Sequence, residues 1–287
     1  MSKIVNPSLV AKIMKERGFN TKKRFGQNFL IDQNIVNRIV NSAELEKDDW
    51  VIEIGPGLGA LTTLMSEVAQ CVVAMEIDTH LVSILEELID QPNINIVEGD
   101  ALAIDWEKCL TGHGWKDEPL KLVANLPYYL TTPLIMKALE SDLPFKSVVV
   151  MVQKEVAERI LAKPNSKDFG VLSLAVQYYS EPSLVANVPR TVFIPSPAVD
   201  SAVIKLKPIS PLVDAPRKEL FEVIRASFQQ RRKTIRNALK PLIKSWGISS
   251  EQIDDALARA KIESNVRGEC LALEDYGVLT KELMRGV

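Results

Sequence analysis

Between residues 50 and 152, short and almost wholly apolar runs alternate with segments whose apolar residues recur at helical spacing. The runs at 51–54 and 148–152 are typical of strands that are buried on both faces of a sheet. After the first run, apolar residues recur at i, i+3, i+4 and i+7, which indicates a helix. These residues are Leu61, Leu64, Met65 and Val68. The alternation predicts an α/β fold with a parallel sheet covered by helices on both faces.

A proline-rich break at residues 208–211 separates this part from a region with helical periodicity throughout. Before the break, residues 184–188 and 202–206 are predicted to close the sheet as an antiparallel pair. Beyond it, an apolar stripe and a basic face predict a helix that Pro241 ends or kinks. The stripe is Phe221, Ile224, Phe228, Ile235, Leu239 and Leu242, and the basic face is Arg232, Arg236 and Lys240. We therefore predict two domains, residues 1–208 with a basic N-terminal segment, and residues 212–287.

The formal net charge of −2 hides a strong separation of charge along the chain. Residues 1–40 contain eight basic and two acidic residues, residues 41–120 three basic and seventeen acidic, and residues 217–244 nine basic and two acidic. Basic clusters on either side of an acidic segment suit a protein that follows a nucleic-acid backbone with part of its surface. Solvated helix faces are the alternative interpretation of each single cluster.

Cysteine spacing and hydropathy exclude several classes of protein. The three cysteines, Cys71, Cys109 and Cys270, have no C-x-x-C spacing, so we expect neither disulfides nor a metal site. No stretch approaches about 18 consecutive apolar residues, and the N-terminus lacks an apolar secretory core. We therefore expect a cytoplasmic protein that does not enter a membrane.

Glycines and polar residues follow four of the predicted strands at the point where each strand ends. Residues 55–59 (Gly-Pro-Gly-Leu-Gly) follow the first strand, Glu76 ends the second, Asp100 follows the third and Asn125 ends another. Ligands of parallel sheets bind at the carboxyl ends of the strands, so these residues predict one site. The glycines allow close approach of a ligand, Glu76 is placed to hold a ribose diol, and Asp100 to accept a bond from an adenine amino group.

The tetrapeptide Asn125-Leu126-Pro127-Tyr128 is suited to holding an NH2 group on a flat ring. The side-chain carbonyl of Asn125 can accept one N–H bond, and the backbone carbonyl of Leu126 can accept the other. Pro127 fixes its own φ and favours an extended Leu126. Tyr128 offers a stacking face worth roughly 1–3 kcal/mol per base. A loop that merely ends a strand is the alternative interpretation.

The glycine turn also has to be compared with that of dinucleotide-binding folds, because Gly55, Gly57 and Ala60 fit their permissive fingerprint. Against a dehydrogenase, nothing downstream indicates a hydride-transfer site, and the two histidines have no evident catalytic setting. The succession of glycine turn, two strand-end carboxylates and Asn-Leu-Pro-Tyr instead resembles the class I S-adenosylmethionine-dependent methyltransferases.

Six motifs, in order along nearly the whole chain, resemble those of the ribosomal RNA adenine dimethyltransferases. They are Lys-Arg-Phe-Gly-Gln-Asn-Phe-Leu at 23–30, Glu-Ile-Gly-Pro-Gly-Leu-Gly at 53–59, Asn-Leu-Pro-Tyr at 125–128, Phe-Ile-Pro-Ser-Pro-Ala-Val-Asp-Ser at 193–201, Phe-Gln-Gln-Arg-Arg-Lys-Thr at 228–234 and Val-Arg-Gly-Glu at 266–269. The chain is most similar to the bacterial members that dimethylate two adjacent adenines near the 3′ end of 16S rRNA. The resemblance implies a Rossmann-like sheet of seven strands, a helical RNA-binding domain, S-adenosyl-L-methionine as cofactor and the small ribosomal subunit as partner. We also expect a monomer.

The resemblance also extends the set of expected site residues. The cofactor is expected to contact Gln27, Asn28, Leu30, Glu53, Gly55, Gly57, Glu76, Ile77, Asp100, Ala101 and Asn125. The catalytic group is Asn125, Leu126, Pro127 and Tyr128, with Phe193 as a second aromatic wall around the acceptor base. RNA binding is expected of Lys22, Lys23, Arg24, Arg231, Arg232, Lys233, Arg236 and Lys240. Core packing is the alternative for Phe193, orientation of the glycine loop for Glu53, and helix capping or packing for Gln27, Asn28 and Leu30.

Two rival functions stay open. Antibiotic-resistance enzymes that methylate adenine in large-subunit rRNA share the catalytic motifs, although the Gln-Arg-Arg-Lys and Arg-Gly-Glu segments favour the small-subunit enzymes. The second rival is a non-catalytic RNA-binding assembly factor. The intact glycine turn, strand-end carboxylates and Asn-Leu-Pro-Tyr loop argue against this second rival.

Overall fold

The computed structural model describes residues 6–16, 27–211 and 213–285. The chain forms two compact units, each with its own core. The first consists of Met1–Ala157 and Pro182–Pro208, and the second of Glu158–Glu181 and Ile209–Val287. Within the described ranges, no helix combines the length and the apolar character needed to cross a membrane.

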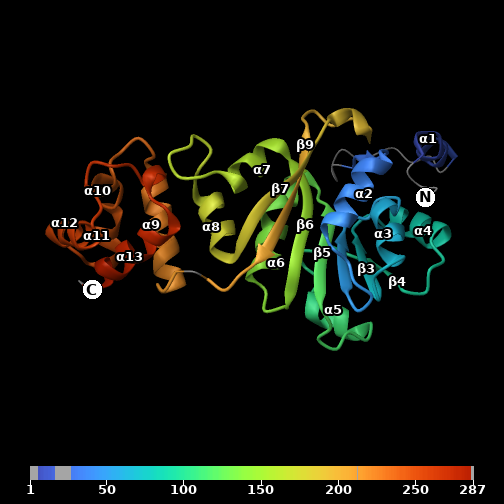
Figure 1. Cartoon of the computed structure of the whole chain (residues 1–287), viewed down its shortest axis with the longest axis horizontal. Helices are drawn as coiled ribbons and strands as arrows, with labels where there is room; N and C mark the ends of the chain where they lie inside the picture. Colours follow the sequence, from blue (N-terminus) through green and yellow to red (C-terminus); the bar gives the residue numbers. More distant parts are fainter. Residues whose placement is uncertain (1–5, 17–26, 212, 286–287) are drawn as a thin grey trace. The chain divides into compact units, whose positions relative to one another are not determined.

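A sheet of seven strands, in the order β4-β3-β2-β5-β6-β9-β7, forms the centre of the first unit (Figure 1). The strands are β2 (Trp50–Ile54), β3 (Cys71–Glu76), β4 (Ile94–Glu98), β5 (Leu120–Asn125), β6 (Phe145–Gln153), β7 (Ser180–Val188) and β9 (Ser201–Pro208). Strands β2 to β6 run parallel, and β9 runs antiparallel to β6. The predicted seven-stranded sheet is confirmed, and the two predicted closing strands are neighbours in it as β9 and β7.

Helices pack on this sheet because its central strands are apolar on both faces. Every residue of β2 and of β3 is buried, as expected for parallel strands that are covered on both sides. On one face, Ile39 of α2 and Met65 of α3 belong to the same core as Val51, Val123 and Val149 of the sheet. The helices of the first unit are α1 (Pro7–Glu16), α2 (Gln33–Ser42), α3 (Ala60–Ser66), α4 (Thr79–Leu88), α5 (Trp106–Gly112), η3 (Tyr128–Leu130), α6 (Thr131–Glu140) and η4 (Arg190–Val192), and the boundary between the units falls within α7 (Lys154–Leu161).

A second, two-stranded sheet joins distant parts of the first unit. Strand β1 (Phe29–Leu30) pairs antiparallel with β8 (Phe193–Ile194), and Leu30 lies opposite Phe193. The pairing fixes residues of the predicted N-terminal motif beside those of the Phe-Ile-Pro-Ser-Pro motif.

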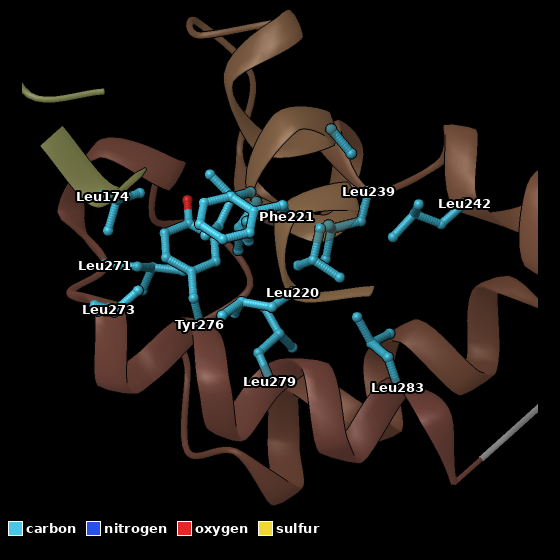
Figure 2. Packing of buried hydrophobic residues seen from close by; sticks show 14 of the residues in the cluster. Leu174, Leu220, Phe221, Leu239, Leu242, Leu271, Leu273, Tyr276, Leu279 and Leu283 are labelled. Carbon is cyan, nitrogen blue, oxygen red and sulfur yellow. The ribbon is translucent and has the colours of Figure 1, made fainter. Parts of the chain in front are cut away.

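The second unit is a helical core of α8 (Val171–Tyr179), α9 (Arg217–Gln229), α10 (Ile235–Ala238), α11 (Pro241–Trp246), α12 (Ser250–Arg259), η5 (Gly268–Cys270) and α13 (Leu273–Met284). Leu220 of α9 and Leu279 of α13 belong to its buried core, with Tyr276 among them (Figure 2). The Tyr276 hydroxyl donates to the Gly268 carbonyl at 2.9 Å. A Cβ at Gly268 would lie 2.9 Å from the Cβ of Ser227, so glycine is needed where η5 packs on α9.

The helical region differs from its prediction in two ways. The predicted stripe does not lie on one helix, because α9 ends at Gln229 and a turn precedes α10. Pro241 does not end a helix but begins α11, where its missing N–H is not required. In addition, residues 158–181, which the sequence pattern leaves in the first domain, belong to the helical unit, since Phe169 and Leu174 are buried in its core.

Candidate active site

The parallel strands end at a pocket where the order of the sheet reverses. From β2 the sheet continues through β3 and β4 on one side and through β5 and β6 on the other, and ligands bind at such a switch point. The pocket is lined by Gly55 after β2, Glu76 at the end of β3, Asp100 after β4 and Asn125 at the end of β5. The structure thus brings together the four strand ends that the sequence pattern predicts to meet.

The turn from β2 to α3 depends on glycine for its conformation and for space. Gly55, Gly57 and Gly59 have φ angles of 68°, 61° and 87°, which side chains rarely adopt. A Cβ at Gly57 would also lie 3.2 Å from the ring of Phe29. The turn therefore packs closely against β1 and presents its backbone to the pocket.

Two buried carboxyl groups line the pocket. Glu76 is 5% exposed, and its Oε1 accepts a hydrogen bond from the backbone N–H of Asp78 at 3.0 Å. Burial raises the pKa of Glu76 to about 7, although this hydrogen bond opposes the rise. Glu53 is 1% exposed, and its Oε2 has no hydrogen-bond partner among the described residues. Burial, to which the nearby Glu76 adds, raises the pKa of Glu53 to about 8. Acceptors buried in this way fit a ligand that brings hydroxyl groups or positive charge.

The carboxylate of Asp100 is fixed by the loop that it begins. Its Oδ1 accepts a hydrogen bond from the backbone N–H of Leu102 at 2.9 Å. Its backbone carbonyl accepts two more bonds, from Ala103 and Ile104, both at 2.9 Å. Asp100 therefore sits in a tight turn at the pocket, with Ala101 beside it in the lining.

The side-chain amide of Asn125 is oriented by the backbone of the N-terminal motif. Its Nδ2 donates to the carbonyl of Asn28 at 3.3 Å, which leaves Oδ1 as the acceptor end of the amide. The adjacent backbone N–H of Leu126 donates to the Met151 carbonyl in β6 at 3.2 Å. The chain around Asn125 is thus anchored on both sides, and Asn125, Leu126 and Pro127 all line the pocket.

Tyr128 is held by a hydrogen bond from the start of β9. Its hydroxyl lies 2.6 Å from Oγ of Ser201, which is fully buried. Burial raises the pKa of Tyr128, although the hydrogen bond with Ser201 opposes the rise. The ring position therefore depends on a contact with the last residue of the Phe-Ile-Pro-Ser-Pro-Ala-Val-Asp-Ser motif.

The N-terminal motif reaches the same pocket. Gln27 donates through Nε2 to Oδ2 of Asp78 at 2.9 Å, and Asp78 caps α4 by accepting from the backbone N–H of His80. All eleven residues expected to contact the cofactor line the pocket, as do Leu126, Pro127 and Tyr128. Lys22, Lys23 and Arg24, which are expected to bind RNA, lie outside the described residues.

Phe193 is not brought into the pocket with the other predicted residues. Its side chain is 3% exposed and belongs to the core that includes Leu30, Met151 and Val203. The pairing of β1 with β8, which the sequence does not reveal, contributes to this burial because it places Phe193 opposite Leu30 in the same core.

Two aromatic residues that sequence reasoning passes over do line the pocket. Phe29 packs on the glycine turn, and Tyr129 is 52% exposed beside Tyr128. The signal for Phe29 is its place between the predicted contacts Asn28 and Leu30. For Tyr129 the signal is only an aromatic residue adjacent to the Asn-Leu-Pro-Tyr tetrapeptide.

The basic residues of the helical unit divide into paired and exposed side chains. Arg231 donates to Glu269 at 2.7 Å and to the carbonyl of Phe169 at 3.1 Å, so it holds the loop before α8. Arg236 makes two short bonds to Asp254, at 2.5 and 2.6 Å. Of the helical-unit residues that are expected to bind RNA, three are exposed and have no ion-pair partner in the described part of the chain: Arg232, Lys233 and Lys240. These three are the cations of the predicted set that stay available to a phosphate backbone.

Solved structures of similar architecture include two RNA methyltransferases. A dimethyladenosine transferase from Plasmodium falciparum is 26% identical, with a TM-score of 0.76, and the match covers 90% of this chain and 98% of that one. The 23S rRNA methyltransferase ErmE is 27% identical, with a TM-score of 0.68 and coverage of 90% and 100%. The fold is that of class I S-adenosylmethionine-dependent methyltransferases.

Sequence comparison gives the family. Proteins named ribosomal RNA small subunit methyltransferase A from Alkaliphilus metalliredigens and Streptococcus thermophilus are each 46% identical to this chain. The first match covers 99% of both proteins and the second 98% of both. The model of the ribosomal RNA adenine dimethylase family matches residues 18–277. The chain therefore belongs to the ribosomal RNA adenine dimethylases, enzymes that use S-adenosyl-L-methionine as methyl donor.

Proposed function

We propose that this protein methylates N6 of two adjacent adenines near the 3′ end of small-subunit (16S) rRNA, giving dimethyladenosines. The two relatives named for the small subunit support this choice of RNA, because they match the chain over nearly its whole length. The observation that carries the chemistry is the orientation of Asn125. Its amide nitrogen is engaged by Asn28, so its oxygen is the acceptor in a pocket that also contains Tyr128.

The pocket suits S-adenosyl-L-methionine by its pattern of acceptors. Glu76 is placed to accept from ribose hydroxyls and Asp100 from the adenine amino group. Glu53 keeps its proton in the cofactor-free protein, and a positively charged ligand nearby would lower its pKa and favour the ionised form. Gln27, Asn28 and Leu30 would hold the methionine part. The cofactor supplies a methyl group that is activated by the positive charge on its sulfur.

The acceptor loop does its work by positioning. An adenine N6 is a poor nucleophile because its lone pair is delocalised into the ring. Acceptance of its two N–H bonds by Oδ1 of Asn125 and the carbonyl of Leu126 favours a more tetrahedral nitrogen, whose lone pair can be directed at the methyl group. Stacking on Tyr128 fixes the plane of the base. Positioning of this kind can supply about 7–11 kcal/mol of the barrier reduction in favourable cases.

Phe193 has a different role in this proposal from the one that family resemblance implies. Because its side chain is buried and Phe193 pairs with Leu30, we favour support of the N-terminal motif over direct contact with the base. Phe193→Leu should then lower the melting temperature of the protein. The rate of methyl transfer from bound substrates should stay near that of the wild type.

RNA binding is proposed for the helical unit and the basic N-terminal segment. The exposed cations Arg232, Lys233 and Lys240 support this proposal for the helical unit. A ribosomal substrate also implies action in the cytoplasm, and we propose that the protein works there as a monomer and takes part in small-subunit biogenesis.

The choice of RNA is tested by mass spectrometry of rRNA nucleosides. Unmodified small subunits and protein-free large-subunit RNA are each incubated with the protein and S-adenosylmethionine that carries a labelled methyl group. We expect labelled dimethyladenosine at two adjacent positions of the small-subunit RNA. Label confined to the large-subunit RNA would favour the antibiotic-resistance type of activity. The structural similarity to the 23S rRNA methyltransferase ErmE is the observation that keeps this alternative open. Absence of label from both, with RNA binding intact, would favour a non-catalytic assembly factor.

A further inference from the structure

One lysine of α6 holds together the loop that begins with Asp100. The Nζ of Lys137 donates to the carbonyls of Ala101 and Leu102, both at 2.9 Å, and to that of Ile104 at 2.6 Å. An ammonium group has three donors, so this loop uses all of them. Three backbone carbonyls that converge on one point repel each other unless a cation lies between them.

The ammonium group of Lys137 is further enclosed by Trp106. It lies 4.8 Å from the centroid of the Trp106 ring, a distance at which a cation is attracted to the aromatic face. The indole N–H of Trp106 also donates to the Ala101 carbonyl at 2.8 Å. Desolvation lowers the pKa of Lys137, while Asp100 and Asp105 oppose this change. The lysine is therefore built into the loop and is not a solvated surface cation.

The position of Lys137 links two parts of the pocket. Asp100 and Ala101 line it at the proposed adenine end, and the Asp100 carboxylate is fixed by the N–H of Leu102, whose own carbonyl is bound to Lys137. Helix α6 begins at Thr131, directly after the Tyr128–Leu130 turn of the acceptor loop.

We propose that Lys137 is a positioning residue for the cofactor: it holds the Asp100 loop in the conformation that binds the adenosine part of S-adenosylmethionine. This inference rests on the proposed function, because it assigns the adenine to Asp100. Lys137 acts through the loop and does not itself contact the cofactor.

The test compares Lys137→Met, which removes the ammonium but keeps a side chain of similar length, with Lys146→Met. Lys146 is an exposed lysine of β6 that does not line the pocket. Calorimetry with S-adenosylmethionine and with 5′-methylthioadenosine measures both affinities. We expect both dissociation constants to rise roughly ten- to a hundredfold in Lys137→Met, as for loss of charged hydrogen bonds. Lys146→Met should bind as the wild type does, and RNA affinity should stay unchanged in both variants.

Because 5′-methylthioadenosine lacks the amino-acid part, a similar loss for both ligands locates the defect at the adenosine end. A double-mutant cycle with Asp100→Ala then tests the route. If Lys137 acts through Asp100, the double variant should bind no more weakly than Asp100→Ala alone. Losses that add independently would overturn that route.

Unchanged ligand affinity in Lys137→Met, even with a lower melting temperature, would overturn the inference, because the lysine would then serve stability alone. If Lys137→Met does not fold, Lys137→Arg carries the test. The planar guanidinium keeps the charge but cannot donate to three convergent carbonyls from one atom. The affinity of Lys137→Arg for S-adenosylmethionine should therefore fall, and an affinity equal to that of the wild type would overturn the inference. Failure of wild-type protein to bind S-adenosylmethionine would instead refute the proposed function itself.

Discussion

Replacement of Tyr128 by phenylalanine separates the ring of the acceptor loop from its hydroxyl. The hydroxyl lies 2.6 Å from Oγ of Ser201, and Ser201 is fully buried, so Tyr128→Phe leaves a buried hydroxyl without this partner. Such a group typically costs about 1–3 kcal/mol of unfolding free energy. For a unit of this size, that corresponds to a fall in melting temperature of roughly 2–12 °C.

The rate of methyl transfer should respond differently from stability. Tyr128→Phe keeps the stacking face, so we expect a single-turnover rate within about tenfold of wild type. Tyr128→Ala removes stacking worth roughly 1–3 kcal/mol, a factor of about 5–150 in rate, and also leaves a space in the pocket. Combining Tyr128→Phe with Ser201→Ala should restore most of the lost stability, because both partners of the bond are then replaced by groups that need none.

The assay is single-turnover transfer to unmodified small subunits, with thermal melting of each variant measured in parallel. Equal rate losses in Tyr128→Phe and Tyr128→Ala would refute the reasoning, because the hydroxyl and not the stacking face would then be what the site uses. If Tyr128→Phe has the same melting temperature as the wild type, the hydrogen bond to Ser201 contributes nothing to stability.

Two further predictions concern the buried carboxyl group and the basic surface. The pKa of Glu53 is raised to about 8 from its ordinary 4.5, so the folded protein keeps a proton that the unfolded chain loses between these values. The stability of the cofactor-free protein should therefore fall as pH rises from about 4.5 to 8, and Glu53→Gln should flatten this fall in thermal melts. Parallel curves of melting temperature against pH for the two proteins would contradict the assignment of the raised pKa to Glu53. Joint replacement of Arg232, Lys233 and Lys240 by alanine should weaken RNA binding and reduce its salt slope by about 2–3 in titrations at several salt concentrations. Arg236→Ala is the matched control and should leave the slope near wild type, since Asp254 already pairs with Arg236; an unchanged slope in the triple variant would make those cations a solvated surface.

The sheet and the main pocket residues are predictable from sequence because their signals are local. Buried parallel strands such as β2 and β3 are continuous apolar runs, and the residues that end such strands must meet at one edge of the sheet. Glu76, Asp100 and Asn125 can therefore be placed together before the fold is known. The glycine turn has the same local character, because its three φ angles require glycine.

The remaining features depend on contacts between distant parts of the chain, which periodicity does not report. The bonds of Lys137 span 33 to 36 residues, and the contact of Tyr128 with Ser201 spans 73. Burial of Phe193 follows from the pairing of two-residue strands, which are too short to give a pattern. Arg236 looks like a free cation on a helical face until its partner Asp254, 18 residues later, is known. The break between α9 and α10 escapes prediction because apolar residues continue at helical spacing across it.

The central claim is that Asn125 presents its carbonyl oxygen to the acceptor nitrogen and so acts on the chemical step. The most direct measurement is the single-turnover rate of methyl transfer by Asn125→Ala, with affinities for S-adenosylmethionine and for the small subunit measured on the same protein. Loss of one directed hydrogen bond of this kind costs about 2.7–4 kcal/mol of barrier, so the rate should fall by roughly two to three decades while RNA affinity changes little. Transfer at the wild-type rate by Asn125→Ala would remove this loop from the active site and contradict the account.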